Sequence, residues 1–337
     1  ELQTGAFRWL NNHLKNDTSL IEKTAVKFFE PEQLKVFDQL PADQRNTEIH
    51  ESFVPAAEPP PVPADAAAWQ VMRDSWQAAL LEKSFRAWPA APCALDATQA
   101  LSADREGLHL EAVDFTSQEA IRLRLYLVHR AALDKPESVV LNVLDDQTWK
   151  EFLAAMRPAF EAEFQGEPLP PADEAAFRKT AETLRNSGLV LAYVAPRGAG
   201  PTAWDQTERK QTQHQRRFYL LGQTLDGMRV WDVRRAIQVL RSIQPVGQTP
   251  LTLQSRHTAA GVALYAALFE PDVRRLELHD LPRSHRDGPY LLNVQRYLDM
   301  PQAVAMAAEK TDVVIQQADA AGWEYPAAVV KRLGWDA

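Results

Sequence analysis

Short apolar segments alternate with amphipathic helical segments over most of the chain. Two segments in which apolar and polar positions alternate predict an antiparallel hairpin, and five further apolar segments predict buried strands. The expected strands cover residues 108–113, 121–128, 138–144, 188–195, 251–254, 274–279 and 311–317. Because helical segments separate most of these strands, we expect right-handed crossovers and a mostly parallel sheet that is covered on both faces.

Helical periodicity predicts the elements that cover this sheet. A helix is expected over residues 69–88, and a long helix from about residue 217 to 242 carries an apolar stripe that would pack on the sheet. After the sixth expected strand, a polar loop precedes helical segments at 291–298 and 301–310.

The first part of the chain has a different pattern. Helices are expected over residues 4–15 and 31–40, and five prolines follow within residues 55–63. Successive prolines fix φ and remove backbone donors, so this segment should be extended and semi-rigid. We therefore expect an N-terminal arm at 1–54, a Pro-rich linker at 55–68 and a domain at 69–337. The arm would dock onto another unit.

Composition limits the classes of partner. The chain has 337 residues, 45% of them hydrophobic, which is enough for a large core. Its net charge of −8 argues against nucleic acid, which requires concentrated Lys and Arg, and the basic run at 209–217 is expected to be a solvated helix face. No apolar run approaches the roughly 18 residues of a membrane span, so no membrane partner is expected.

Cysteine usage and the first residues add two further expectations. Cys93 is the single cysteine, so neither a disulfide within the chain nor a thiolate metal site is expected. The N-terminus lacks the basic and then apolar pattern of a secretion signal. The chain begins with Glu1 rather than Met, which suggests a processed product or a fragment of a longer protein.

Residues 249–269 have the pattern of a buried strand, a tight turn of small residues and an Ala-rich helix. This is the setting of a nucleophile elbow, which needs the pattern small-x-nucleophile-x-small around a sharp turn. In one register His257 takes the nucleophile position, flanked by Ser255 and Ala259. In the other, Gly261 closes the turn and Ala259 takes that position. Neither register provides a Ser or Cys nucleophile.

Three segments carry a resemblance to a known family. Residues 5–15 (GAFRWLNNHLK) resemble the last helix of a bacterial acetyl xylan esterase or related α/β-hydrolase, the part that follows its catalytic histidine. The region from about Trp69 to Trp335 resembles the C-terminal, degenerate half of large two-unit esterases of the same group, and residues 196–201 (PRGAGP) and 217–233 (RFYLLGQTLDGMRVWDV) carry that likeness.

The resemblance implies a fold, a partner and a compartment. The fold would be an α/β-hydrolase-like three-layer sandwich, preceded by the helical arm and the Pro-rich linker. The partner would be a preceding catalytic hydrolase unit or a second copy of the chain, with a carbohydrate ester as a further candidate ligand. Location in the periplasm or outside the cell would follow from the family.

A catalytic triad in this fold needs a nucleophile after the fifth strand, an acid after the seventh and a histidine after the eighth. Asp319 follows the seventh expected strand and is the candidate acid, with the alternative that it caps the next helix. No histidine follows Asp319 in the sequence. The loop that should help to bind the oxyanion contains Asp145 and Asp146, whose charges would repel it. Either one could instead cap a helix that starts near Thr148.

A cluster of polar residues follows the sixth expected strand. Its candidate ligand-binding residues are His279, Asp280, Arg283 and His285. His and Asp can bind zinc, but the spacing fits no known site and the arginines oppose a cation, so a salt-bridged loop is the alternative and no metal is expected. The arginines could also bind a carboxylate such as a uronic acid.

The turn at residues 196–201 adds Arg197 to the candidate ligand-binding residues. It has the pattern of neither a dinucleotide-binding nor a phosphate-binding loop, so no cofactor is expected.

Three functional hypotheses follow. The first is a non-catalytic pseudo-hydrolase module that supports or shapes a partner hydrolase unit. The second is an active carboxylesterase or deacetylase that uses an atypical site around Ser255, His257, Asp280 and His285. The third is a ligand-binding or oligomerisation protein that retains the cleft without chemistry.

Overall fold

The protein is described by a computed structural model that covers residues 2–21, 29–53, 57–205 and 207–335. Its internal contacts divide the chain into two units, Glu1–Pro55 and Ala56–Ala337. The first unit contains helices α1 (Leu2–Lys15) and α2 (Pro31–Leu34) and a short 3₁₀ turn (Ile49–Ser52). None of its described side chains is buried.

Helix α2 is shorter than the sequence pattern predicted. The expected helix over 31–40 ends at Leu34, because Lys35 adopts an extended conformation with ψ 116°. The next apolar side chains, Val36 and Phe37, are exposed. Short helices are marginal without a packing surface, and none of the described residues of this unit provides one, so the apolar pattern is not sufficient to extend α2.

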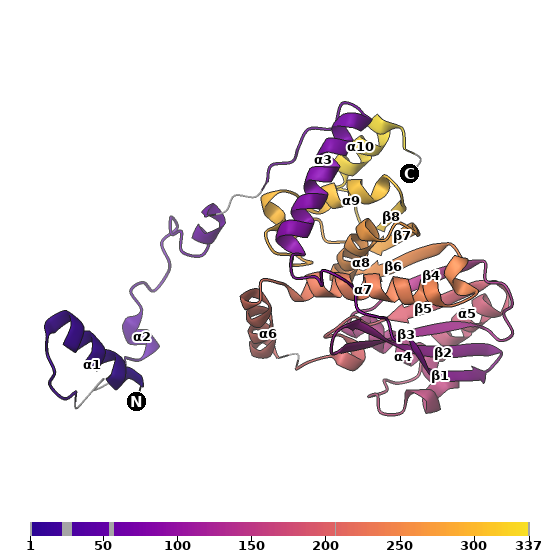
Figure 1. Cartoon of the computed structure of the whole chain (residues 1–337), viewed down its shortest axis with the longest axis horizontal. Coiled ribbons are helices and arrows are strands. Elements are labelled where there is room, and N and C mark those ends of the chain that lie inside the picture. Colours follow the sequence, from indigo (N-terminus) through magenta and orange to yellow (C-terminus); the bar gives the residue numbers. More distant parts are fainter. Residues whose placement is uncertain (1, 22–28, 54–56, 206, 336–337) are drawn as a thin grey trace. The chain divides into compact units, whose positions relative to one another are not determined.

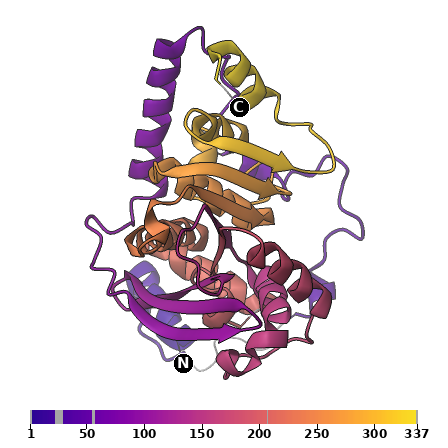
Figure 2. The same cartoon turned by 90° about the vertical axis from the view of Figure 1, so that its right-hand side faces the viewer.

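An eight-stranded sheet forms the second unit (Figures 1 and 2). Its strands run in the spatial order β1-β2-β3-β5-β4-β6-β7-β8. Four neighbouring pairs, from β5 to β8, are parallel and the three pairs from β1 to β5 are antiparallel. The strands are β1 (Thr98–Arg105), β2 (Leu108–Gln118), β3 (Ile121–Arg130), β4 (Ser138–Val143), β5 (Leu189–Val194), β6 (Leu251–Arg256), β7 (Val273–His279) and β8 (Asp312–Gln316).

The predicted α/β architecture with a mostly parallel sheet is confirmed, with one additional strand. All seven expected strands are present within a few residues of their expected ends. Strand β1 was not predicted, because its side chains are mostly exposed and carry no apolar alternation. It is held by antiparallel pairing to β2 and lies at one edge of the sheet, while β8 lies at the other.

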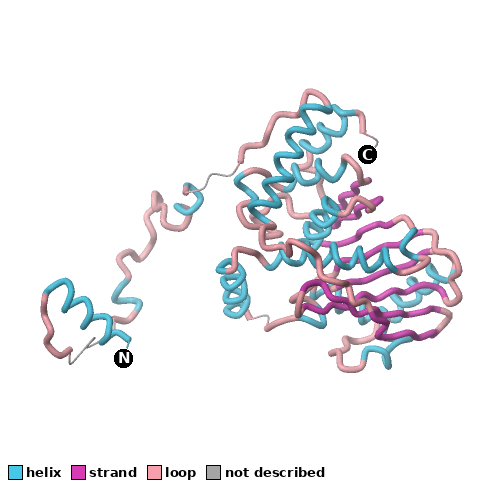
Figure 3. The backbone as a smooth tube through the Cα atoms, in the orientation of Figure 1, coloured by secondary structure: helices cyan, strands magenta, loops and turns pink. Residues whose placement is uncertain are grey.

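Helices cover both faces of the sheet and enclose two cores (Figure 3). The larger core lies under α7 (Leu225–Ser242), α8 (His257–Phe269) and α9 (Met300–Ala308), with Tyr265 fully buried in it. The smaller core lies under α4 (Asp146–Phe160) and α5 (Glu174–Arg185). Helix α10 (Glu324–Leu333) packs on α9. Alternate side chains of the central strands enter the two cores, as expected for strands buried on both faces.

The prediction of one helix over residues 217–242 was wrong, because two helices cover this segment. Helix α6 (Glu208–Leu220) ends before Gly222, which has a positive φ of 69°. Helix α7 then starts anew, with the hydroxyl of Thr224 accepting a hydrogen bond from the N–H of Gly227. Glycine tolerates the left-handed conformation that ends a helix, and Thr is a favourable N-cap. The apolar stripe continues across this break, which concealed it in the sequence.

Two other helical predictions need correction at their ends. The expected helix over 69–88 is α3 (Ala66–Ala79) followed by a single π-helical turn (Leu80–Ser84). The expected helix over 291–298 is only a 3₁₀ turn, Val294–Arg296, which follows Asn293 in the left-handed conformation. Among the described helices, none is both long and apolar enough to cross a lipid bilayer.

Candidate functional site

The turn from β6 into α8 has the backbone geometry of a nucleophile elbow. Strand β6 ends at Arg256 and α8 begins at His257, which has a positive φ of 53°. A positive φ is uncommon for a residue other than glycine and marks a strained turn. The register in which His257 takes the nucleophile position therefore describes the turn. His257 stands at the tip with its side chain exposed, whereas Ala259 already belongs to the helix.

Ser255 is close to His257 in sequence, but its side chain is held by the sheet. Only 4% of the residue is exposed, and its hydroxyl donates a hydrogen bond to the carbonyl oxygen of Val143 at 2.7 Å. Val143 is the partner of Ser255 in the parallel pair of β4 and β6. The Ser255 hydroxyl thus joins the ends of two strands, and its proton is engaged in that bond.

A cavity of about 310 Å³ opens beside the elbow. It lies at the ends of β4, β5 and β6, where ligands bind in folds with parallel sheets. The residues that line it are Leu144, Asp145, Asp146, Pro196, Gly198, Ala199, Trp204, Asp205, Gln211, His214, Gln215, Tyr219, Thr224, Leu225, Asp226, Arg229, His257, Thr258, Ala259, Val262 and Tyr290. Sequence reasoning had identified His257 and Ala259 of the elbow, the two aspartates of the β4–α4 loop and the turn at residues 196–201.

The two aspartates of the β4–α4 loop hold backbone groups. Asp145 caps α4, and its carboxylate accepts hydrogen bonds from the N–H groups of Gln147 and Thr148 at 3.0 and 2.8 Å. Asp146 accepts one from the N–H of Gly200 at 2.9 Å. The helix-capping interpretation is confirmed for Asp145. Both carboxylates line the cavity where an oxyanion site would have to donate hydrogen bonds.

The opposite wall of the cavity contains residues that sequence reasoning did not identify. Asp226 accepts hydrogen bonds from the Arg229 guanidinium at 3.2 Å and from the N–H of Tyr290 at 2.8 Å. Burial raises the pKa of Tyr219, and the nearby charge of Asp226 raises it further. Tyr219 therefore presents a neutral hydroxyl at physiological pH. Because these residues are far apart in the sequence, no short motif identifies the contacts between them.

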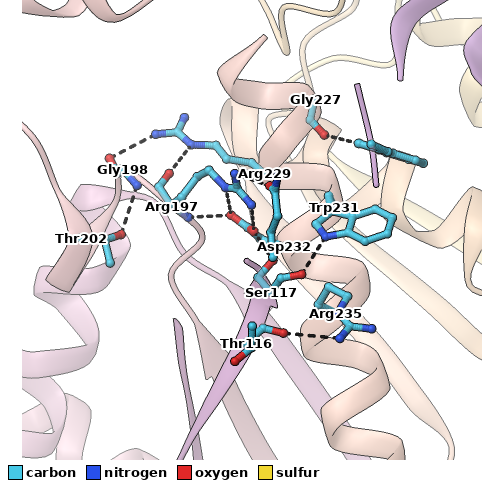
Figure 4. Close-up of polar contacts among 12 residues, drawn as sticks. Thr116, Ser117, Arg197, Gly198, Thr202, Gly227, Arg229, Trp231, Asp232 and Arg235 are labelled. Carbon is cyan, nitrogen blue, oxygen red and sulfur yellow. Dashed lines mark hydrogen bonds and ion pairs between the residues drawn. The ribbon is translucent and has the colours of Figure 1, made fainter. Parts of the chain in front are cut away.

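Arg197 belongs to a buried ionic network beside the cavity (Figure 4). Its guanidinium donates two hydrogen bonds to the carboxylate of Asp232, at 2.8 and 2.6 Å, and its own N–H donates a third at 2.9 Å. Asp232 also accepts a hydrogen bond from the hydroxyl of Ser117. The carbonyl oxygens of Arg197 and Gly198 in turn bind the Arg229 guanidinium. This network fixes the turn that forms one wall of the cavity.

The candidate polar residues at and after the end of β7 do not form one binding site. Arg283 forms an ion pair with Asp319, with 2.6 Å between Nη2 and Oδ1. His279 accepts a hydrogen bond from the side-chain amide of Gln254 at 3.2 Å, and Asp280 is exposed with a positive φ of 48°. The described residues include no group of three or more His, Cys, Asp or Glu side chains that could hold a metal ion.

Asp319, the candidate acid, is separate from the elbow cavity. The ion pair with Arg283 lowers its pKa, and a hydrogen bond from the N–H of Ala321 lowers it further. It lines a different, mostly apolar hollow between β8 and α10, together with Ile315 and Trp323. It is not among the described residues that surround His257. The structure therefore does not bring this acid and the elbow imidazole into one site.

His285, the last candidate of the cluster, lies in the core and is 3% exposed. The Pro289 carbonyl oxygen lies 2.7 Å from Nδ1, so Nδ1 carries the proton, and Nε2 accepts a hydrogen bond from the Tyr265 hydroxyl at 2.8 Å. Both ring nitrogens of the neutral imidazole are thus satisfied. Burial lowers the pKa of His285, because the charged form would lose its hydration.

This lowered pKa predicts a pH-dependent stability. The unfolded state takes up a proton on His285 below about pH 6.5, whereas the folded state does so only at a lower pH, so stability falls by up to about 1.4 kcal/mol per pH unit between the two pKa values. The contribution is fully present above pH 6.5 and is lost as the pH decreases. Urea unfolding at pH 7.5, 6.5 and 5.5 should give a shallower dependence for His285→Gln than for the wild type. Equal slopes for His285→Gln and the wild type would contradict this assignment.

Comparison with known proteins identifies the class of fold. No protein-family model matches the sequence, and no curated protein matches it either. A protein from Bacteroides fragilis classed as an acetyl xylan esterase is similar in structure, with a TM-score of 0.67 and 12% identity over 91% of this chain and 84% of the other. A glucuronoyl esterase from Solibacter usitatus gives a TM-score of 0.59 and 16% identity, over 84% of this chain and 87% of its own.

A third structure is similar to the same extent. A promiscuous CE15 esterase from a marine bacterial metagenome gives a TM-score of 0.57 and 13% identity, over 84% of this chain and 87% of its own. At such low identity the likeness shows the fold alone. The chain has an α/β-hydrolase-like fold of the kind found in these esterases.

Proposed function

We propose that this chain is a non-catalytic pseudo-hydrolase module that supports or shapes a partner hydrolase unit. One observation carries the proposal: the tip of the elbow holds His257, with φ 53°, where an esterase of this fold places its nucleophile. The strained turn is retained while the hydroxyl that would use it is absent. Ser255 offers no replacement, because its buried hydroxyl is bound to Val143.

The electrostatics of the cavity support the same proposal. An acyl-transfer site needs hydrogen-bond donors directed at a developing negative charge. Here the loop after β4, the strand that pairs with β6, presents Asp145 and Asp146, which are themselves acceptors for backbone N–H groups. Asp319 is paired with Arg283 in another part of the unit. Nucleophile, oxyanion site and acid thus each depart from what the reaction needs.

The N-terminal arm supports the assignment of a partner. Its α1 helix carries Phe7, Leu10 and Leu14 at helical spacing, all at least 40% exposed. The arm exposes large apolar side chains along its whole described length: Phe7, Trp9, Leu10, Leu14, Leu20, Phe29, Leu34, Val36, Phe37, Leu40, Ile49 and Phe53. Exposure of this many large apolar side chains in one short segment favours a surface that another protein covers. The partner we propose is a preceding hydrolase unit, with a second copy of this chain as the alternative.

The competing proposal is an active esterase with an atypical site. The exposed imidazole of His257 beside the cavity favours it, because an imidazole can act as a general base or a nucleophile. The two proposals differ in whether any serine of the folded chain is activated.

A fluorophosphonate probe tests this difference, because labelling requires an activated serine. We expect the folded chain to be labelled no more than the heat-denatured chain, and the His257→Ser variant to be equally unreactive. The variant supplies a hydroxyl at the tip. His214 also lines the cavity, but among the described residues no hydrogen bond to a carboxylate orients its ring as a triad base would need. Stoichiometric labelling of the folded wild type that Ser255→Ala removes would overturn the non-catalytic assignment.

A further inference from the structure

Three neighbouring strands place an aspartate and two histidines in one row. Asp104 on β1 pairs with His109 on β2, and His109 pairs in turn with His129 on β3. The three strands are adjacent at one edge of the sheet (Figure 1). Directly paired residues of antiparallel strands have side chains on the same face, about 5 Å apart. The row is therefore a consequence of the register.

Hydrogen bonds fix both imidazoles in the same tautomer. The carboxylate of Asp104 lies 2.8 Å from Nδ1 of His109, and the carbonyl oxygen of Arg130 lies 2.8 Å from Nδ1 of His129. Both partners are acceptors, so each Nδ1 carries a proton. Each Nε2 then has a free lone pair, since neither forms a hydrogen bond within the described part of the chain. A histidine that ligates a metal usually has this arrangement, with its other nitrogen held by a carboxylate or carbonyl.

The two rings are stacked. Their centroids are 5.0 Å apart and their planes differ by 29°. Two imidazoles on one tetrahedral zinc have their ligating nitrogens about 3.4 Å apart, given Zn–N distances of about 2.0–2.1 Å. To ligate one ion, the stacked rings must turn about their side-chain bonds until both Nε2 atoms face it.

The surroundings of the two rings attract a cation. His109 is accessible, with 22% of its side chain exposed. The carboxylates of Asp104 and Glu111 lie close enough to His129 to interact with it electrostatically. The neighbouring arginines belong to the other face of the sheet, because Arg105 and Arg130 both pair with Leu108, a residue of the smaller core. Carboxylates thus lie near the two imidazoles, whereas Arg105 and Arg130 lie on the other face of the sheet.

We propose that His109 and His129 form a two-histidine binding site for a divalent transition metal ion. Imidazole nitrogen is a ligand for Zn²⁺, Cu²⁺ and Ni²⁺, whereas Mg²⁺ and Ca²⁺ prefer oxygen. Asp104 orients His109 through its second nitrogen, and water completes the coordination. Because the site lies on the β1–β3 face and not at the elbow, it is independent of whether the chain is catalytic.

Calorimetric titration of the chelator-treated chain with Zn²⁺ in a non-coordinating buffer tests the site. His109→Ala and His129→Ala should each weaken Zn²⁺ binding at least about tenfold, and Asp104→Ala, which removes the orienting carboxylate, about tenfold. Asp104→Asn keeps an acceptor and should have a smaller effect. His257→Ala and His279→Ala are the matched controls and should leave the affinity unchanged, and Mg²⁺ should give no saturable heat.

Electron paramagnetic resonance of the Cu²⁺-loaded chain provides a second readout. We expect hyperfine coupling to two imidazole nitrogens, with one coupling lost in each single-histidine variant. Binding that is unchanged in both variants, or that is lost in His257→Ala instead, would overturn the proposal. Absence of saturable Zn²⁺ and Cu²⁺ binding at neutral pH would also overturn it. Circular dichroism of each variant shows whether the sheet is intact.

Discussion

Asp232→Ala should lower the free energy of unfolding by about 3–5 kcal/mol, because it leaves the Arg197 guanidinium buried without a counter-charge. Asp232 is fully buried and Arg197 is 8% exposed. The substitution removes two hydrogen bonds from the guanidinium, one from the Arg197 N–H and one from the Ser117 hydroxyl. Urea unfolding followed by tryptophan fluorescence measures the loss.

Asp312→Ala is the matched control for this prediction. Asp312 also pairs with an arginine, Arg275, but both side chains are about 40% exposed. An exposed ion pair contributes only about 0–1 kcal/mol. A double substitution, Asp232→Leu with Arg197→Met, should cost less than Asp232→Ala because no charge is left unpaired. Equal losses for Asp232→Ala and Asp312→Ala would contradict the buried-network account.

Gly261→Ala should lower the stability by about 2 kcal/mol. A Cβ atom at this position of α8 would lie 2.3 Å from Cδ and 2.8 Å from Cγ of Pro289, whose ring cannot turn away. Overpacking of a core costs about 1–3 kcal/mol, and a contact this short belongs at the upper end. The gain in helix propensity from Gly to Ala, about 1 kcal/mol, offsets only part of it. Thermal unfolding monitored by circular dichroism checks the net effect.

The control for this effect is Gly188→Ala. There the new Cβ would meet Cγ and Cδ of the exposed Glu137 side chain at 2.5 and 2.8 Å, and these atoms move when that side chain rotates, whereas its Cβ at 3.0 Å does not. We therefore expect a smaller loss of stability than for Gly261→Ala. If Gly261→Ala lowered the stability no more than Gly188→Ala does, then α8 would be less closely packed against Pro289 than the structure indicates.

The sheet could be predicted from the sequence where its strands are buried. The apolar runs in β4, β5 and β6 are long enough to identify strands, and their separation by helical segments determines parallel pairing. Strand β1 could not be found this way, because its stability comes from pairing to β2 and not from burial. The break between α6 and α7 was also missed, since only Gly222 interrupts an otherwise continuous helical pattern.

The candidate site was predictable only in its local parts. The small residues on either side of His257 identified the elbow, and Asp145 was recognised as a possible helix cap. The ionic network could not be anticipated, because Asp232 lies 35 residues from Arg197 in the sequence. The His109 and His129 pair depends on the register of a hairpin, which periodicity alone does not determine.

The structure defines the geometry of the β6–α8 elbow, for which the sequence left two registers open. Its turn keeps the strained backbone of a catalytic elbow, and β6 and α8 hold that turn in place. The functional groups around the turn differ from those that acyl transfer needs. An imidazole stands at the tip, and the nearby carboxylates accept hydrogen bonds from backbone N–H groups. The elbow thus belongs to the α/β-hydrolase-like fold of this chain, and the proposed non-catalytic role is the one that fits the groups around it.

Steady-state hydrolysis of p-nitrophenyl acetate is the most direct test of this account. We expect the wild type and His257→Ala to hydrolyse the ester at the same slow rate, without saturation up to the solubility limit of the substrate. Both folded proteins should match an unrelated protein at equal concentration. Saturable turnover by the wild type that is lost in His257→Ala, in a variant shown to be folded, would contradict the account and establish an active esterase.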